Sequence, residues 1–305
     1  MHHLTVGVFH DETISRELGK KGTESDIVMF NRKMDDCIFT FMSPVADKLS
    51  AKSQIISTID AAVVAFSQMT RELGETILML DLMGVRDGIA ITTPYATPDQ
   101  IAAITRTTAI NSYKVEPNNP GRLLELLKTI NPKRDNVSPP VIVVDHSFSV
   151  KGVGEVVLGF VKQGTVRKYD ELNLLPANKE VIVRSIQIQD EDWETADAGT
   201  RVGLAIKGAT VDELGRGSVL TTSPDITADS RLKVNFQKST FYAEVRQGSF
   251  HATIGMQTIP ITISEIGGDS LVIDSANPIV HATQDTLLLL DLNAKRTRII
   301  GRGTV

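Results

Sequence analysis

The stretch of sequence that decides the fold is Val144–Val166, which reads VDHSFSVKGVGEVVLGFVKQGTV. Its apolar residues come in short runs that glycines interrupt, a pattern typical of strands joined by tight turns. We expect Gly152 and Gly154 to adopt positive φ at such a turn, and Gly159 to let two backbones approach closely. Phe148 is expected to fill the interior. The stretch therefore predicts the first strands of a small β-barrel.

Strand-like runs continue to the end of the chain, and helical patterns nearly vanish after residue 139. The break at Thr221–Ser230, which is rich in Thr, Ser, Asp and Pro, divides these runs into two groups. We therefore predict two all-β barrels, at residues 141–222 and 230–305. The predicted strands are Val141–Val144, Glu155–Phe160, Val181–Gln187, Arg201–Ile206, Phe241–Val245, Ile259–Ser264, Leu271–Ile273, Thr286–Leu292 and Arg298–Ile300.

The first part of the chain alternates strand-like and helical patterns. Such alternation predicts an α/β domain at residues 1–138, with a mostly parallel sheet that helices cover on both faces. The polar, proline-containing segment Asn131–Pro140 is the predicted linker to the barrels. The predicted strands are Leu4–Phe9, Ile38–Met42, Ala61–Phe66 and Gly88–Thr92, and the predicted helices are Arg71–Met83, Pro98–Thr105 and Pro120–Ile130.

Composition excludes several classes of protein. The 305 residues are 41% hydrophobic with no apolar run long enough for a membrane helix, so we expect no membrane partner. The net charge of −5 argues against non-specific coating of nucleic acid, and we expect no DNA partner. The single cysteine, Cys37, permits no internal disulfide, and the six histidines lack the spacing of metal ligands. No catalytic constellation stands out. The chain begins without a basic and then apolar segment, so a cytoplasmic location is expected.

Three further motifs accompany the stretch that decides the fold: RSIQ at Arg184–Gln187, AGTRVGLAIKG at Ala198–Gly208 and RGSVL at Arg216–Leu220. With them, residues 144–222 resemble the second domain of translational GTPases, the elongation factor Tu and SelB group. Residues 232–305 resemble the third domain of this family more loosely, through the residues His251, Gly255 and Leu287–Gly303.

The resemblance covers essentially the whole chain in the domain order of the family, and it points to an archaeal SelB-like paralogue. It implies a G-domain-like α/β sheet followed by two β-barrels. It also implies aminoacyl-tRNA and the ribosome as partners, and GTP with Mg²⁺ as the ligands of the first domain.

The sequence motifs of the family's nucleotide site are missing from this chain. A phosphate-binding loop needs Gly-Lys before the first helix, but the chain has His10, Asp11, Glu12 and Thr13. We predict that Asp11 caps that helix, so its carboxylate takes the amides that would bind phosphate. The family's DxxG would fall near Met42–Val45, and its NKxD would follow Gly88–Ile91; neither is present. Residues 10–13 are therefore predicted to be a vestigial phosphate loop, and no cofactor is expected.

One Gly-Lys pair does occur, within Gly19–Thr23. It follows a predicted helix instead of a strand. We therefore expect a helix C-terminus, with a glycine stop and two lysines that complement the helix dipole. In the alternative, Lys20 or Lys21 would serve a divergent phosphate loop, and GTP and Mg²⁺ would bind.

The resemblance places the aminoacyl group in a pocket of the second domain near its junction with the first. Asp145, His146 and Arg201 match that pocket by motif. Arg201 suits a polar or anionic group, and Asp145 would orient it through charge-assisted hydrogen bonds. His146 stands where SelB factors commonly have Arg, so the charge at this point depends on pH. The alternative for Asp145 and Arg201 is an ordinary salt bridge on the barrel surface.

The third domain of the family contacts tRNA, largely through the RNA backbone. The candidate residues here are His251, Lys295, Arg296, Arg298 and Arg302. Alternation along a strand would place Arg296 and Arg298 on one face. The alternatives are a solvated basic edge strand and, for His251, a structural histidine of the barrel.

These observations predict an elongation-factor-like protein that binds aminoacyl-tRNA through its barrels and has lost GTP binding and hydrolysis. Two alternatives stay open. One is a working GTP-binding elongation factor with a divergent phosphate loop, and the other is a protein-binding scaffold without an RNA ligand.

Overall fold

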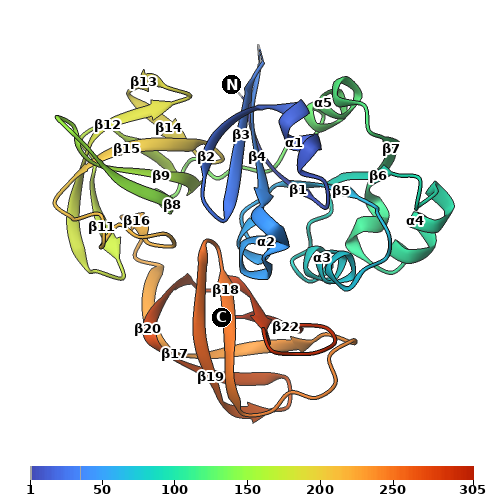
Figure 1. Cartoon of the computed structure of the whole chain (residues 1–305). Coiled ribbons are helices and arrows are strands. Elements are labelled where there is room, and N and C mark those ends of the chain that lie inside the picture. The colour runs from blue at the N-terminus through green and yellow to red at the C-terminus, as the bar shows by residue number, and fades with distance from the viewer. Residues whose placement is uncertain (1, 35) are drawn as a thin grey trace. The chain divides into compact units, whose positions relative to one another are not determined.

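The computed structural model describes residues 2–34 and 36–305. Its first part is an α/β domain built on a seven-stranded sheet in the order β2-β3-β4-β1-β5-β6-β7 (Figure 1). Strands β4, β1, β5, β6 and β7 run parallel, whereas β2, β3 and β4 pair antiparallel. The elements are β1 (His2–Phe9), α1 (Glu12–Leu18), β2 (Lys20–Glu24), β3 (Ile27–Lys33), β4 (Cys37–Pro44), α2 (Leu49–Ile56), β5 (Ala61–Ala65), α3 (Arg71–Leu82), β6 (Gly88–Thr92), α4 (Pro98–Thr105), β7 (Lys114–Pro117) and α5 (Pro120–Lys128), with 3₁₀ turns η1 (Val45–Asp47) and η2 (Ala109–Ser112).

Both faces of this sheet are buried, as the sequence predicts. Alternate residues of β4, such as Phe39 and Phe41, share one core with Ile14 of α1 and the leucines of α5. The residues between them, Thr40 and Met42, are also buried, and α2 packs against β4. Because successive side chains of a strand point to opposite faces, helices must cover both sides. The predicted helices all form, while α2 and the strands β2, β3 and β7 were not foreseen.

The next part is a closed six-stranded barrel, β11-β16-β8-β9-β15-β12, which the pairing of β11 with β12 completes. Gly152 and Gly154 have φ of 85° and 106°, and a Cβ on Gly159 would lie 2.6 Å from the carbonyl oxygen of Val143. These predictions are confirmed. Phe148 is only partly buried, so its predicted place in the interior is wrong. The elements are β8 (Val141–Val150), β9 (Gly154–Gln163), β10 (Thr165–Arg167), β11 (Glu171–Leu175), β12 (Lys179–Ile188), β13 (Glu191–Trp193), β14 (Thr195–Asp197), β15 (Arg201–Lys207) and β16 (Val219–Thr221).

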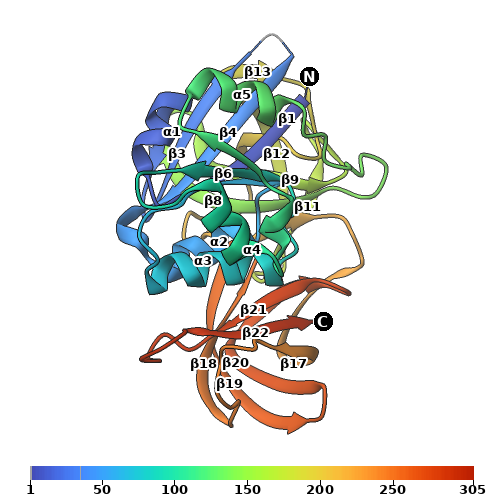
Figure 2. The ribbon, with the colours of Figure 1, turned by 90° about the vertical axis from the view of Figure 1, so that its right-hand side faces the viewer.

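The last part is a second closed barrel, in the order β17-β20-β19-β18-β21-β22, whose strands are all labelled in Figure 2. The two predicted all-β barrels are therefore confirmed. The elements are β17 (Ile226–Lys238), β18 (Gly248–Ile254), β19 (Gln257–Gly267), β20 (Ser270–Ala282), β21 (Thr286–Leu290) and β22 (Ile299–Thr304).

Two predictions in this barrel are wrong. Strand β17 begins at Ile226, inside the predicted break, and Phe241–Val245 is a loop instead of a strand. The ammonium group of Lys238 donates hydrogen bonds to the carbonyl oxygens of Ser239, Tyr242 and Ala243. Carbonyl groups that are gathered around one cation cannot form a strand ladder, because a ladder needs them to alternate toward its neighbours.

The chain forms two compact units. One contains the chain up to Pro132 together with Phe236–Arg246 and Thr286–Gly303, and the other contains Lys133–Asn235, Gln247–Asp285 and the last two residues. In the described part of the chain, we find no helix with the length and apolar character needed to span a bilayer.

Candidate functional site

The turn after β1 replaces the expected phosphate loop and contains only two residues, His10 and Asp11. Asp11 is the N-cap of α1: its Oδ1 accepts hydrogen bonds from the backbone nitrogen of Thr13 at 2.9 Å and from its hydroxyl at 2.5 Å. The predicted cap is confirmed. Glu12, in the first turn of the helix, pairs with Arg16 at 2.8 Å. Carboxylates therefore occupy both positions where a phosphate would meet the positive end of the helix dipole.

His10 is a second departure from a phosphate loop. Its φ of 70° lies in the left-handed region, where a non-glycine residue is uncommon. Its Nε2 lies 2.9 Å from the hydroxyl of Thr76 on α3. The same hydroxyl donates to the carbonyl oxygen of Glu72 and accepts from the fully buried ammonium group of Lys52, on α2, at 3.4 Å. Hydrogen bonds thus link the turn after β1 to α3 and α2.

Neighbouring positions of the expected nucleotide site are also closed by internal contacts. The buried hydroxyls of Ser15, on α1, and Ser43, at the end of β4, lie 2.6 Å apart. After β6, the hydroxyl of Thr93 donates to the carbonyl oxygen of Phe66. Because acidic side chains and short internal bonds occupy these positions and no lysine lies in the turn, the residues do not fit the phosphates of GTP or an accompanying Mg²⁺ ion.

The second Gly-Lys candidate lies elsewhere. Helix α1 ends at Leu18 with Gly19 as its C-cap, as predicted, but Lys20 and Lys21 then belong to strand β2. Both lysines are exposed, and Lys21 pairs with Glu24 at 2.6 Å. The chain enters the edge strand directly after the cap, and the interaction of the two lysines with the helix dipole stays a prediction.

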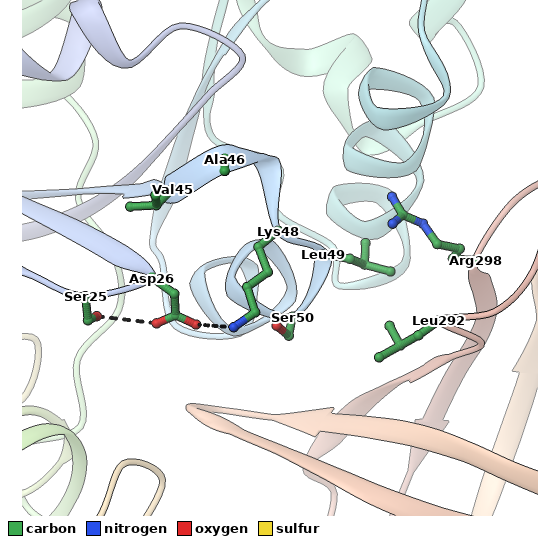
Figure 3. Close-up of a pocket in the computed structure, with 9 residues that line it drawn as sticks. All are labelled: Ser25, Asp26, Val45, Ala46, Lys48, Leu49, Ser50, Leu292 and Arg298. Carbon is green, nitrogen blue, oxygen red and sulfur yellow. Dashed lines mark hydrogen bonds and ion pairs between the residues drawn. The ribbon is translucent and has the colours of Figure 1, made fainter.

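A cavity of about 720 Å³ opens between the β2–β3 turn, the start of α2 and the β21–β22 loop (Figure 3). Asp26 on its wall pairs with Lys48 at 3.3 Å and accepts a hydrogen bond from Ser25. Leu292 and Arg298 form the wall that the β21–β22 loop contributes. The cavity thus lies outside the turn where a nucleotide would bind in the family.

The aminoacyl-pocket candidates do come together in the first barrel. Asp145 lies at a break in the register of β8 and β9, between the pairs Val144–Gly159 and His146–Leu158. A bulge of this kind re-aims a side chain, and here the carboxylate meets Arg201 of β15. The Nε of Arg201 donates to Oδ2 at 2.8 Å and its Nη2 donates to Oδ1 at 3.3 Å.

This ion pair is buried. The side chain of Asp145 is 2% exposed and that of Arg201 is 10% exposed, so the salt bridge that the alternative expects does form, but it is buried and does not lie on the barrel surface. The guanidinium also lies 5.9 Å from the centre of the Phe160 ring, and Arg216 donates to the carbonyl oxygen of Asp145 at 3.0 Å. His146 is partly buried, with its ring 5.9 Å from that of Phe148. One carboxylate thus orients one guanidinium beside an aromatic ring, with a histidine as the next residue of the strand.

The tRNA-binding candidates of the second barrel do not form one surface. Arg298 precedes β22 and donates to both carboxylate oxygens of Glu75 on α3, through Nε at 3.1 Å and through Nη2 at 2.5 Å. The Glu75 side chain is 2% exposed and that of Arg298 17%. Arg302, on β22, donates to the carbonyl oxygen of Leu82. These two cations bind the protein itself.

The remaining candidates lie elsewhere in the barrel. Lys295 and Arg296 are exposed in the β21–β22 loop, so the predicted strand alternation of Arg296 with Arg298 is wrong. His251 is partly buried on β18, opposite Pro260 of β19.

Comparison with known proteins places this arrangement in a family. Residues 154–221 match the model of elongation factor Tu domain 2. An uncharacterized protein of Methanocaldococcus jannaschii is 35% identical over 99% of both chains. The selenocysteine-specific elongation factor of the same organism is 35% identical over 60% of this chain and 44% of its own length. The chain belongs to the SelB and elongation factor Tu-like family.

Solved structures agree on the fold of this family member. SelB of Methanococcus maripaludis, crystallised with the GTP analogue GppNHp, is 22% identical with a TM-score of 0.84, covering all of this chain and 79% of its own. A bacterial selenocysteine-specific elongation factor, EF-Sec, is 17% identical with a TM-score of 0.84, covering all of this chain and 58% of its own. The chain thus has the fold of these structures.

The sequence did not reveal three polar residues of this SelB-like chain: Lys52, Glu75 and Thr76. A signal existed for Thr76, because it lies three residues after Leu73 and four before Leu80, on the buried face of α3. Glu75 is also buried on α3, where a carboxylate needs a partner, but the partner is 223 residues away in the sequence. Among residues 2–34 and 36–305, no three His, Cys, Asp or Glu side chains form a group that could hold a metal ion.

Proposed function

We propose that this protein is a translation factor of the cytoplasm that holds aminoacyl-tRNA through its two barrels and no longer binds or hydrolyses GTP. The observation that carries the loss of GTP is the Asp11 carboxylate, which accepts the free amide at the start of α1. A triphosphate would have to displace that carboxylate and approach Glu12 as well. Both steps are unfavourable, since anion sites at helix N-termini depend on free amides and on the dipole.

Support for the RNA part of the proposal comes from the first barrel and the family. The family membership provides the partner class, because selenocysteine-specific elongation factors are translation factors by name. The barrel offers a guanidinium that Asp145 holds in a fixed orientation next to His146. A fixed guanidinium can recognise a carbonyl or anionic group without first losing side-chain entropy. We propose the aminoacyl group as its ligand, with the ribosome as the destination of the complex.

Calorimetric titration with GTP and GDP, each with Mg²⁺, tests the nucleotide part. We expect no saturable heat in the micromolar range for the wild-type chain. The matched variant is Asp11→Gly, which frees the amides of α1 and keeps a residue that is acceptable at an N-cap. A weak gain of binding in that variant alone would identify the carboxylate as the block. Micromolar binding by the wild-type chain would contradict the proposal and favour a working GTPase.

Gel-shift titration with charged and uncharged forms of the same tRNA, at two salt concentrations, tests the RNA part. We expect salt-dependent binding of both forms, with the aminoacylated form bound more tightly. Arg201→Lys keeps the charge beside Asp145 but loses the two-pronged geometry of the guanidinium. It should reduce the preference for the charged form more than the affinity for bare tRNA. Absence of RNA binding at low salt would favour a protein-binding scaffold.

A further inference from the structure

Two loops at one end of the second barrel carry an unusual exposed surface. The first loop joins β17 to β18 and includes Phe241 and Arg246; the second joins β21 to β22 and includes Lys295 and Arg296. The hydroxyl of Tyr242, in the first loop, donates to Asp291 in the second at 2.7 Å, so the loops lie side by side. We call the set Phe241, Arg246, Lys295 and Arg296 the aromatic-basic platform.

The first loop is built to keep one conformation. The ammonium group of Lys238 donates hydrogen bonds to three carbonyl oxygens of this loop. The backbone nitrogen of Ser239 donates to the carbonyl oxygen of Ile300. Burial and the hydrogen bond to Asp291 raise the pKa of Tyr242 to about 12, so this hydroxyl stays a donor at physiological pH. A loop held by the hydrogen bonds of Lys238 and Tyr242 presents its outer side chains at little further entropic cost.

The outer side chains of the platform are exposed. The Phe241 side chain is 74% exposed, the most of any aromatic residue in the described chain. No ion pair or hydrogen bond of the Arg246, Lys295 or Arg296 side chain occurs within the part of the protein that the structure describes. One exposed carboxylate, Glu244, lies in the same loop. The exposed charge of the platform is therefore positive, although the chain as a whole carries −5.

An exposed ring and exposed cations on two adjoining loops match the chemistry of a nucleotide. A base stacks on an aromatic face, and the guanidinium and ammonium groups bind the phosphates on either side of it. A base can stack on a side chain only when it is unpaired, since the bases of an A-form helix stack on each other. We propose that the aromatic-basic platform binds an unpaired nucleotide segment of RNA, with one base on Phe241.

The proposal rests on the proposed function in that both assign RNA as the partner, but it names a separate contact of different chemistry. Arg298 and Arg302, which the sequence pointed to, are held by Glu75 and by the carbonyl of Leu82. Arg246, Lys295 and Arg296 are exposed cations of the two loops. Backbone recognition of a duplex needs no aromatic ring, so the exposed Phe241 distinguishes the two modes.

Fluorescence anisotropy with the full chain tests the proposal on two labelled RNA probes, a single strand of about eight nucleotides and a duplex of the same length, a size that suits one small barrel. We expect Phe241→Ala to weaken binding of the single strand by about 5- to 150-fold and to leave the duplex unchanged. Phe241→Tyr should keep the affinity, because the ring remains. Replacing Lys295 and Arg296 by Gln should each reduce the slope of log affinity against log salt by about 0.7.

Matched controls lie on the α/β domain: Tyr95→Ala removes a ring that is 62% exposed, and Lys114→Gln and Arg86→Gln remove exposed cations. These variants should change neither affinity nor salt slope. Equal losses on both probes, or no binding of the single strand at low salt, would overturn the platform. The probes carry no aminoacyl group, so their binding does not depend on the proposed aminoacyl pocket. A negative result with these probes would therefore contradict only RNA binding at the platform. The proposed function is tested separately, by the difference in affinity between charged and uncharged tRNA.

Discussion

The β1–α1 turn and the first barrel each depend on one aspartate, and the two aspartates make contacts of opposite kinds. Asp11 lies at the partly exposed β1–α1 turn and accepts only from the residue two positions along the chain. Asp145 is 2% exposed in a bulge of the first barrel and pairs with Arg201, 56 residues away. The first carboxylate caps a helix with a local bond, whereas the second depends on tertiary structure to orient a cation.

The difference separates a contact that forms locally from one that needs the whole barrel. A local cap forms within one turn of helix and contributes about 1 kcal/mol, so a single substitution can create it without disturbing the sheet. A buried ion pair couples two strands, and removal of one partner leaves an uncompensated charge. A cap at Asp11 could therefore arise at little cost to the α/β domain, whereas the barrel could not easily exchange its buried pair.

The largest expected effect is in the barrel. Asp145→Asn should destabilise it by about 3–5 kcal/mol, because the charge of Arg201 would stay buried without a counter-charge. Urea unfolding followed by the fluorescence of Trp193, which lies on β13 of the same barrel sheet, measures the change. The control is Glu171→Gln, which neutralises an exposed carboxylate on β11. A loss no larger than that of the control would mean that solvent reaches Arg201 and that the two aspartates do not differ as described.

The reactivity of Cys37 reports on the α/β domain separately from the barrels. It is buried on β4, and burial, with a smaller contribution from the Asp36 carboxylate, raises the pKa of its thiol to about 11. Because the thiolate is the reactive form, we expect labelling by a thiol reagent near pH 8 to be about 100-fold slower than in the unfolded chain.

The pH dependence of Cys37 has a definite sign. The raised pKa favours the neutral thiol in the folded state, so its contribution to stability is complete below the unfolded pKa near 9 and is lost as the pH rises toward 11. Labelling should stay slow in Asp145→Asn, since the barrel variant leaves β4 intact. Fast labelling of the wild-type chain would show that the sheet around the turn opens readily.

The α/β domain has a buried carboxylate of its own, Glu75. Its substitution tests whether the larger stability loss expected at Asp145 than at Asp11 comes from burial or from the domain in which the carboxylate lies. Glu75→Gln keeps the shape of the side chain but leaves Arg298 without its charged partner. We expect a loss of about 1.5–3 kcal/mol, the range for hydrogen bonds to charged groups, since the amide can still accept one of them. Thermal unfolding measures it against Glu125→Gln, which changes an exposed carboxylate on α5. Equal melting temperatures would show that the Arg298 pair contributes nothing.

The sequence predicted those features whose cause is local or depends on a motif. The cap at Asp11, the turn glycines of β8–β9 and the proximity of Asp145 and Arg201 belong to this group. Partners that are distant in sequence could not be foreseen: nothing near Arg298 indicates Glu75, and nothing near Thr76 indicates Lys52. The loop at Phe241 was mistaken for a strand because its apolar residues suit one, while Lys238, whose ammonium group holds the loop together, reads as an ordinary strand residue.

The smallest expected effect concerns the cap itself. Asp11→Ala should destabilise the α/β domain by only about 1 kcal/mol, because water can replace an exposed cap and Glu12 remains in the first turn. Asp11→Asn should lose less, since an amide oxygen still accepts from the Thr13 nitrogen. The comparison of the two variants by urea unfolding separates the hydrogen bond from the charge. A loss near that of Asp145→Asn would contradict a local role and would mean that the turn, through His10 and Thr76, supports the whole sheet.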